Sequence, residues 1–511
     1  MTVVTLPQRQ GAQDLPHMLA VTNLSPRSGL MPLRLRKVAG RTLLTSDFGD
    51  WVFVDDTELE TLMRGELQAG SDLHKRLRRA NFVRSELNER QLVARASDKV
   101  RFLRTGPHLH VMVVTLRCNT TCVYCHASRA PLHRADTDMS PTTADRVVDM
   151  ALSSTSPAVT IEFQGGEPLA NFDVVKRAIE YALERNRSYG KALEFTLVTN
   201  LSLMTDERME YLLSRRVQIC TSIDGPADLH DSQRVLAGRS AHAEASRWIE
   251  KINERYVALG LDPSLYHVEA LLTTTRGALS RPREIVDSYV NLGCRAIFLR
   301  PVDPFGFAER TRQRIEYPRH EYLAFYREAT DYILELNRKG VQVLERFGAI
   351  FLTKILTQTD PNFVDIRSPC GAGIGQLAYN YDGRVFTCDE GRMLAASGDD
   401  TFHIGTIHSR YRDLVAHETV AALAVASNLD AQPDCVTCAY RPYCGVCPVH
   451  NYATQGTIQG RMRESVLCAV HKGIQDYLFE KLASEDAETR NILRRWTTVR
   501  PRSHFVHACA P

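Results

Sequence analysis

The spacing of apolar residues changes along the chain and predicts two regions of different construction. In the first, apolar and polar residues alternate in two short runs, 33–47 and 50–55, which predict strands. Apolar residues then recur at helical intervals between residues 56 and 83, with Asp or Ser near the start of each helical run. Residues 1–105 are therefore predicted to contain a small α+β module in which strands precede helices.

In the second region, six apolar runs alternate with amphipathic segments. The runs that predict strands are 111–117, 159–165, 194–200, 217–224, 267–275 and 296–302. One of the helices between them is expected to begin at Ser140-Pro141, which supplies an N-cap and a helix-opening proline. Six such repeats predict an α/β fold with a parallel sheet and outer helices, either a barrel or a partial (β/α)6 TIM-like barrel.

Polar and small residues follow the first four predicted strands directly. Three cysteines in the spacing C-x3-C-x2-C come after the first strand, and Gly165-Gly166 come after the second. Asn200 and Asp224 follow the third and fourth strands. Because ligands of such folds bind at the carboxyl ends of the strands, we expect these residues to converge on one mouth.

Composition excludes several classes of protein. The chain has 511 residues, 44% of them hydrophobic and 24% charged, which suits a globular protein of two to four domains. The formal net charge of +3 gives no argument for a nucleic-acid partner, and no apolar stretch reaches the length of a membrane span. The first 19 residues lack the pattern of a secretory signal. We therefore expect a cytoplasmic protein with no membrane partner, in a compartment where thiols stay reduced.

The 13 cysteines fall into two groups, and in a reducing compartment they predict metal ligands or redox groups. The first group is the C-x3-C-x2-C motif. The second group comprises Cys370, Cys388, Cys435, Cys438, Cys444, Cys447 and Cys468. Cys220, Cys294 and Cys509 stand alone. Cys220 and Cys294 lie in apolar runs and are expected to be small core residues.

Four motifs in order give residues 110–305 a family resemblance. They are "CNTTCVYC" at 118–125, "GGEP" at 165–168, "TN" at 199–200 and "SIDGPADLHDSQR" at 222–234. Together they resemble the radical S-adenosylmethionine enzymes. The resemblance implies that Cys118, Cys122 and Cys125 hold a [4Fe–4S] cluster whose fourth iron binds S-adenosylmethionine. It also implies reductive cleavage to a 5′-deoxyadenosyl radical, with an external one-electron reductant.

The resemblance also implies roles for the other motif residues. Gly165, Gly166 and Glu167 would contact the ammonium group of S-adenosylmethionine, and Tyr124 would lie by its adenine. Asn200, Ser222 and Arg234 would contact the ribose or the carboxylate. Asp224 is the candidate catalytic base, by similarity to formylglycine-forming enzymes. Each has an ordinary structural alternative: packing for Tyr124, a turn for Asn200, a surface charge for Arg234 and turn capping for Asp224.

The C-terminal cysteines leave two interpretations open. The spacing C-x2-C-x5-C-x2-C at 435–447 is compatible with structural zinc, which would use four of the seven thiols. The set also resembles the SPASM extension of peptide-modifying enzymes, which carries two auxiliary [4Fe–4S] clusters and would bring the total to three. That resemblance implies an outer set, Cys435, Cys438, Cys444 and Cys468, and an inner set, Cys370, Cys388 and Cys447.

Two departures from the SPASM pattern are visible. Cys444 and Cys447 are separated by two residues, where three are usual. The inner set has three thiols, so its cluster would have an open iron or a ligand of another type. Asp389 and His450 are close in sequence, but a surface or supporting role suits each of them better.

The resemblance implies a maturase that oxidatively modifies or crosslinks a ribosomally synthesised precursor peptide, and the layout is most similar to the maturases of His-Xaa-Ser peptide systems. The N-terminal module resembles leader-recognition domains. A sulfatase-type formylglycine maturase and a non-catalytic iron–sulfur or zinc scaffold are the alternatives. The expected domains are 1–105 (α+β module), 106–310 (partial barrel), 311–365 (helical connector), 366–480 (SPASM domain) and 481–511 (C-terminal tail).

Overall fold

The computed structural model describes residues 29–357, 359–484 and 486–508. Three strands and then three helices come first; strands followed by helices within 56–83 were predicted, and the third helix was not. Their bounds are Leu33–Val38 (β1), Arg41–Ser46 (β2), Trp51–Val54 (β3), Asp56–Arg64 (α1), Asp72–Arg79 (α2) and Glu89–Lys99 (α3). The strands pair in the antiparallel order β1-β2-β3. Helix α1 begins where it does because Asp55 and Glu58 form a capping box.

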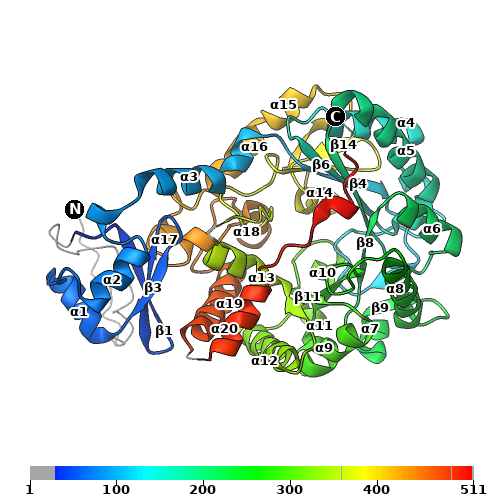
Figure 1. Ribbon diagram of the computed structural model, residues 1–511. Coiled ribbons are helices and arrows are strands. Elements are labelled where there is room, and N and C mark those ends of the chain that lie inside the picture. The colour runs from blue at the N-terminus through cyan, green and yellow to red at the C-terminus, as the bar shows by residue number, and fades with distance from the viewer. Residues whose placement is uncertain (1–28, 358, 485, 509–511) are drawn as a thin grey trace, which may run out of the picture.

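The N-terminal module has a core of its own and docks one face of its sheet on the rest of the molecule. Leu44, Val54 and Leu77 belong to a separate apolar cluster inside the module. On the other face, the Trp51 ring lies 5.4 Å from the ring of Phe479 in α19 (Val466–Ala483), and its indole N–H donates to the carbonyl of Ile355. Figure 1 shows the blue module beside the C-terminal helices.

We expect Trp51→Ala to loosen this docking and to lower the free energy of unfolding by about 3 kcal/mol, because a large ring is lost from a packed contact. Thermal unfolding and limited proteolysis between residues 99 and 109 measure the effect. Trp51→Phe keeps a ring but loses the hydrogen bond to Ile355, and should cost about 1 kcal/mol. Equal stability of Trp51→Ala and the unsubstituted chain would mean that the module is not held through this face.

The main body is built on one ten-stranded sheet, β12-β11-β10-β8-β7-β6-β4-β13-β14-β15. The strands are Leu109–Thr115 (β4), Ala158–Gly165 (β6), Ala192–Val198 (β7), Gln218–Ser222 (β8), Glu269–Thr274 (β10), Ala296–Pro301 (β11), Leu344–Glu345 (β12), Gln376–Tyr379 (β13), Arg384–Phe386 (β14) and His403–Thr406 (β15). The six predicted strands are present, run parallel and follow sequence order across the sheet. The sheet does not close into a barrel, because β13–β15 continue it beyond β4.

Helices cover the sheet between its strands and fill the C-terminal region (Figure 1). Their bounds are Pro141–Leu152 (α4), Phe172–Tyr189 (α5), Asp206–Ser214 (α6), Ala227–Gln233 (α7), Ala241–Ala258 (α8), Pro282–Asn291 (α9), Phe307–Arg310 (α10), Arg312–Ile315 (α11), Arg319–Arg338 (α12), Arg346–Leu352 (α13), Asp389–Ala395 (α14), Tyr411–Val415 (α15), Glu418–Ala426 (α16), Pro433–Val436 (α17), Pro448–Gln455 (α18) and Ala487–Arg495 (α20). Ser140 caps α4 by accepting a hydrogen bond from the N–H of Thr143, as predicted.

The segment that follows α20 crosses the amino ends of the strands. Arg500 donates to the side chain of Gln218 at 2.7 Å, and Arg502 forms an ion pair with Glu194 at 2.7 Å. Leu193 and His507 form a β-bridge. Cys509 lies outside the described residues. No helix in the described ranges is both long and apolar enough to span a membrane.

Candidate active site

The three-cysteine motif lies on a loop after β4 and is held by a short two-stranded ribbon. Thr120–Cys122 (β5) pairs antiparallel with Arg234–Leu236 (β9), in a register that places Cys122 opposite Arg234. A guanidinium nitrogen of Arg234 lies 3.8 Å from the Cys122 sulfur. The ribbon therefore brings together two predicted site residues that are 112 positions apart.

Gly165 and Gly166 let the end of β6 pack directly on the backbone that leads into the cysteine loop. A Cβ on Gly165 would lie 2.0 Å from the carbonyl oxygen of Thr115, and one on Gly166 would lie 2.3 Å from that of Leu116. Gly165 also has a φ of 145°, which glycine tolerates best. The close approach predicted for this pair is thus made to the protein backbone, and it fixes the start of the loop.

We expect Gly166→Ala to displace the cysteine loop, because the clash is with backbone carbonyls that cannot rotate away. Overpacking of this kind costs about 1–3 kcal/mol or more. The matched control is Gly277→Ala, where the added Cβ would meet its nearest neighbour at 3.4 Å. Iron content after anaerobic reconstitution should fall in Gly166→Ala and stay at the unsubstituted level in Gly277→Ala. Full iron content in Gly166→Ala would contradict this account.

Glu167 ties the ends of β6 and β7 together. Its side chain is completely buried and accepts hydrogen bonds from the hydroxyl of Thr199 at 2.6 Å and from the N–H groups of Asn200 at 2.7 Å and Leu169 at 3.0 Å. Burial raises the pKa of this carboxyl, while the three donors oppose the rise. Glu167 thus has a structural role in addition to the predicted contact with the cofactor.

Asn200 extends this link to the cysteine loop. Its side-chain amide donates to the Thr120 hydroxyl at 3.0 Å and the Asn119 carbonyl oxygen at 3.2 Å, and lies 3.8 Å from the Cys118 sulfur. The N–H of Thr120 also donates to that sulfur at 3.4 Å. Asn200 therefore supports the first cysteine, a role that its position in the sequence did not reveal.

Tyr124, Asp224 and Arg234 form one buried group beside the loop. The Tyr124 hydroxyl donates to the Asp224 carboxylate, which also accepts from Nε of Arg234 at 3.1 Å. The Arg234 guanidinium carbon lies 5.2 Å from the centre of the Tyr124 ring. Asp224 is fully buried, and burial raises its pKa while Arg234 and Tyr124 oppose the rise. Ser222, also predicted for this site, is half-buried at the end of β8.

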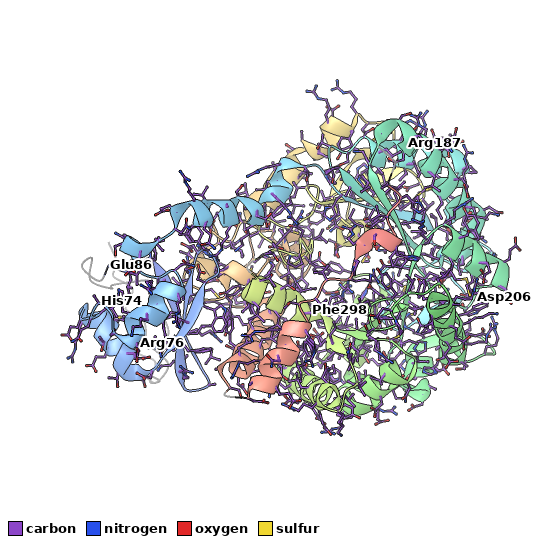
Figure 2. All side chains as sticks on the ribbon, in the orientation of Figure 1. His74, Arg76, Glu86, Arg187, Asp206 and Phe298 are labelled. Atoms are coloured by element: carbon purple, nitrogen blue, oxygen red, sulfur yellow. The ribbon has the colours of Figure 1, made fainter. Side chains whose placement is uncertain are left out.

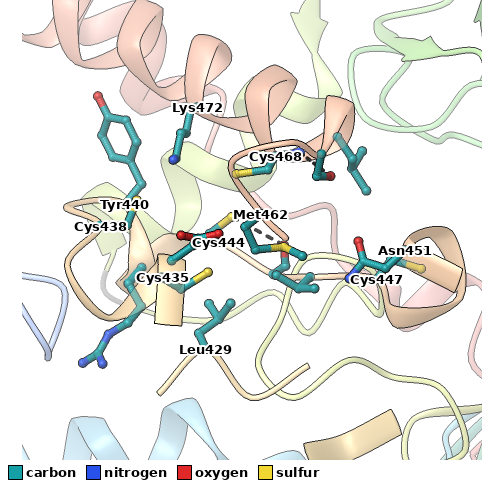
Figure 3. A pocket seen from close by; sticks show the side chains of 16 residues that line it. Leu429, Cys435, Cys438, Tyr440, Cys444, Cys447, Asn451, Met462, Cys468 and Lys472 are labelled. Carbon is teal, nitrogen blue, oxygen red and sulfur yellow. Dashed lines mark hydrogen bonds between the residues drawn. The ribbon is translucent and has the colours of Figure 1, made fainter. Parts of the chain in front are cut away.

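The outer C-terminal thiols surround one small space. Cys435, Cys438, Cys444 and Cys468 line a cavity of about 30 Å³ beneath α19 (Figure 3). The ammonium group of Lys472 acts on Cys435, Cys438 and Cys468, and it opposes the effect of burial on the pKa of Cys468. Cys447 lies on the far side of this space in Figure 3. The structure therefore brings the four outer thiols together, with Cys447 at the edge of the same space.

The inner thiols lie together in a different apolar cluster. Cys370 and Cys447 are hydrogen-bonding neighbours, and Cys388 packs with them. Beside Cys370, the side chain of Arg367 is fully buried and its three nitrogens have no hydrogen-bond partner among the described residues. Its guanidinium stacks 4.0 Å from the ring centre of Phe102. Burial lowers the pKa of Arg367, and Cys370 is the first of the groups that oppose this effect.

The loop after β11 was not predicted as part of the site, yet it reaches the third cysteine. The N–H of Phe307 donates to the carbonyl of Cys125 at 2.8 Å. A Cβ on Gly306 would lie 2.4 Å from the carbonyl oxygen of His126, so this glycine permits the contact. Phe305 packs in the apolar cluster of the inner thiols. The signal in the sequence that could have indicated this contact was Gly306, a glycine in the loop after a predicted strand.

Residues 112–262 match the Radical SAM superfamily. The chain contains a radical SAM domain. The chain is 21% identical over 229 residues to the radical SAM cyclopropyl synthase TigE of Paramaledivibacter caminithermalis. The aligned region covers 42% of this chain. The match spans 46% of TigE, so the chain matches about half the length of that relative.

Two solved structures share the fold. One is anSMEcpe with bound AdoMet, with a TM-score of 0.60 and 17% identity over 76% of this chain and 99% of that chain. The other is Streptococcus suis SuiB bound to S-adenosylmethionine, with a TM-score of 0.51 and 15% identity over 88% of this chain and 99% of that chain. These likenesses confirm the α/β class with its parallel, open sheet.

The radical SAM domain implies a [4Fe–4S] cluster and S-adenosylmethionine, and the three-cysteine loop fits the cluster. Thiolates are the ligands that such clusters need, and three of them leave one iron open. Burial raises the pKa of Cys122 to about 12 and that of Cys118 above its usual range, so binding of iron must displace their protons. N–H donors already point at the Cys118 sulfur.

In the part of the chain that the structure describes, no three His, Cys, Asp or Glu side chains are close enough to bind one metal ion together.

Proposed function

We propose that this chain is a radical S-adenosylmethionine maturase that oxidatively modifies or crosslinks a ribosomally made precursor peptide. The observation that carries the proposal is that the chain has three separate thiol groups: the cysteine loop after β4, the outer set beneath α19 and the inner set in an apolar cluster of its own. The loop with Phe305 and Phe307 runs from the first group to the inner one. A chain that used only the radical cluster would have no need of the outer and inner thiol groups.

The proposal assigns three [4Fe–4S] clusters, held by Cys118, Cys122 and Cys125, by the outer set and by the inner set. When bound, the first cluster with S-adenosylmethionine supplies a 5′-deoxyadenosyl radical that abstracts hydrogen from a substrate carbon. An external one-electron reductant starts each turnover. Gly165, Gly166, Asn200 and Ser222 orient the cofactor and its loop.

Asp224 has two possible roles that one variant separates. As a base it would take a proton from the substrate, but Tyr124 and Arg234 both donate to it, so one of these bonds must first be exchanged. As a positioning residue it would hold Arg234 beside Cys122. We expect Asp224→Asn to keep formation of 5′-deoxyadenosine and to lose peptide modification if Asp224 is the base. Loss of both would assign the positioning role.

The N-terminal module is proposed to bind the leader segment of the precursor. Its order of three strands and then three helices supports this role, as does its separate core. A strand added to a sheet edge would gain main-chain hydrogen bonds and would raise the concentration of the modified segment near the site. SuiB, whose fold is similar, has been solved with the precursor peptide SuiA. Within this class, the layout favours the maturases of His-Xaa-Ser systems.

Mass spectrometry of a co-expressed peptide, encoded beside this chain, tests the proposal. A loss of two mass units without reaction toward a hydrazide indicates a crosslink, and unchanged mass with altered stereochemistry indicates epimerisation. A product that reacts with the hydrazide contains formylglycine and would support the sulfatase-type alternative. Absence of 5′-deoxyadenosine from the reconstituted, reduced protein would instead support a non-catalytic scaffold.

A further inference from the structure

A second cavity, separate from the thiol-lined one, lies between the carboxyl end of β11 and the inner thiols. Its volume is about 50 Å³. The walls come from β11 and the loop after it, from α13, from residues 363–366 and from the starts of α14, α18 and α19. Phe298, labelled near the middle of the molecule in Figure 2, forms part of one wall. Cys447 of the inner set forms part of another.

This cavity has more negative than positive charge. Asp303, Asp365 and Glu390 line it, together with the single guanidinium of Arg300. Arg300 lies 3.6 Å from Asp303, whereas the neighbouring Asp389 is already paired with Arg392 outside the cavity lining. Burial raises the pKa of Asp365, and repulsion from Asp303 adds to the rise. One cation thus faces three carboxyl groups, and buried carboxylates are costly without a partner.

A neutral acceptor completes the lining. The imidazole of His450 is 8% exposed, and its Nδ1 has no hydrogen-bond partner among the described residues. A neutral imidazole can accept a hydrogen bond at such a nitrogen. Like the carboxyl groups, it offers an acceptor to the cavity.

The walls favour an organic cation. Phe298, Phe305, Phe347 and Phe363 all line the cavity, and phenyl faces attract ammonium and guanidinium groups. A water needs about 10–15 Å³ on this measure of volume, so 50 Å³ holds the equivalent of about four waters. That matches the head of a lysine or arginine side chain. As noted above, the described side chains do not converge as the ligands of one metal ion do.

We propose that this cavity binds a basic side chain, lysine or arginine, of the peptide substrate. That the side chain comes from a peptide substrate rests on the proposed function. That the pocket suits a basic group rests on the lining residues alone. Because the loop from Asp303 to Phe307 contacts both Cys125 and the inner thiol cluster, an anchored basic residue would hold its neighbours in the peptide between these two groups. The pocket would therefore select which residue of the substrate is modified.

Binding of two blocked tripeptides to the reconstituted full-length protein tests the pocket. The probes are acetyl-Gly-Lys-Gly-amide and its norleucine analogue, whose side chain keeps the four carbons and lacks the ammonium group. Isothermal calorimetry or saturation-transfer NMR measures both. We expect the lysine peptide to bind at least tenfold more tightly than the norleucine peptide. Asp303→Asn and Asp365→Asn should each weaken the lysine peptide at least tenfold.

The control is Asp400→Asn, since Asp400 is exposed and pairs with Arg384 on the β14 hairpin. Thermal unfolding and iron content verify that each variant is folded. Because two positions are substituted separately, the test still stands if one variant does not fold. Equal binding of the two peptides, no binding of the lysine peptide, or unchanged binding in folded Asp303→Asn and Asp365→Asn would overturn the proposal. Formation of 5′-deoxyadenosine is measured separately, so a failure of the pocket and a failure of the proposed enzyme give different results.

Discussion

Replacing any one of Cys118, Cys122 or Cys125 with alanine is expected to abolish formation of 5′-deoxyadenosine from S-adenosylmethionine. The three thiols are held on one loop by the β5–β9 ribbon, by Gly165-Gly166 and by Asn200. A variant with two thiols cannot ligate three irons of a [4Fe–4S] cluster and leave only the fourth iron open. Anaerobic reconstitution, reduction and chromatography of the product measure the effect. Product at the unsubstituted level in any one of the three variants would rule out the assignment.

The matched control for this result is Cys294→Ala. Cys294 is also a buried thiol, but it lies alone in the apolar core between α9 and β11. Its loss should lower stability by about 1 kcal/mol and leave cofactor cleavage unchanged. A loss of cleavage in Cys294→Ala as severe as in Cys122→Ala would show that the assay reports general damage rather than loss of a ligand.

The second large effect concerns metal content. The reconstituted chain is expected to hold about 12 iron atoms, from three [4Fe–4S] clusters, and Cys444→Ala is expected to reduce this to about 8. Cys444 packs in one apolar cluster with Cys435 and Cys468, whereas the inner thiols lie in another, so its loss should affect one cluster only. Elemental analysis and Mössbauer spectroscopy measure the iron, with Cys220→Ala as the control. Stoichiometric zinc with about four irons would show that the C-terminal thiols form a zinc site.

Six of the ten strands of the main sheet were predictable because each is an apolar run bounded by polar residues, whereas the short strands β12–β15 were not predicted. The ribbon of β5 and β9 was not, since a three-residue strand has too few positions to show a period and its pairing partner is far away in sequence. The pairing of β13 with β4, which joins the C-terminal region to the main sheet, is long-range in the same way. Apolar periodicity identifies a strand but does not identify its neighbour.

The candidate site shows a similar division. Motif spacing predicted that Tyr124, Asp224 and Arg234 share a site, and the structure brings them into contact. The hydrogen bonds that these motifs make to the protein itself were not predictable from the sequence. Glu167 and Asn200 both bond to groups in other strands or loops. The acidic cavity could not be predicted either, because Asp303, Asp365 and Glu390 come from three separate segments.

If the inner thiols hold the proposed cluster, the buried guanidinium of Arg367, which has no hydrogen-bond partner among the described residues, would couple assembly of that cluster to folding. A buried charge without a partner costs several kcal/mol, and arginine cannot lose its charge to avoid that cost. The guanidinium packs directly on Gly375, where a Cβ would lie 1.9 Å from Nη2. Deprotonation of Cys370 upon ligation would supply the missing negative charge. We therefore expect the iron-free chain to be protease-sensitive near residues 360–390, so that the supply of iron and sulfide limits how fast this region matures in the cell.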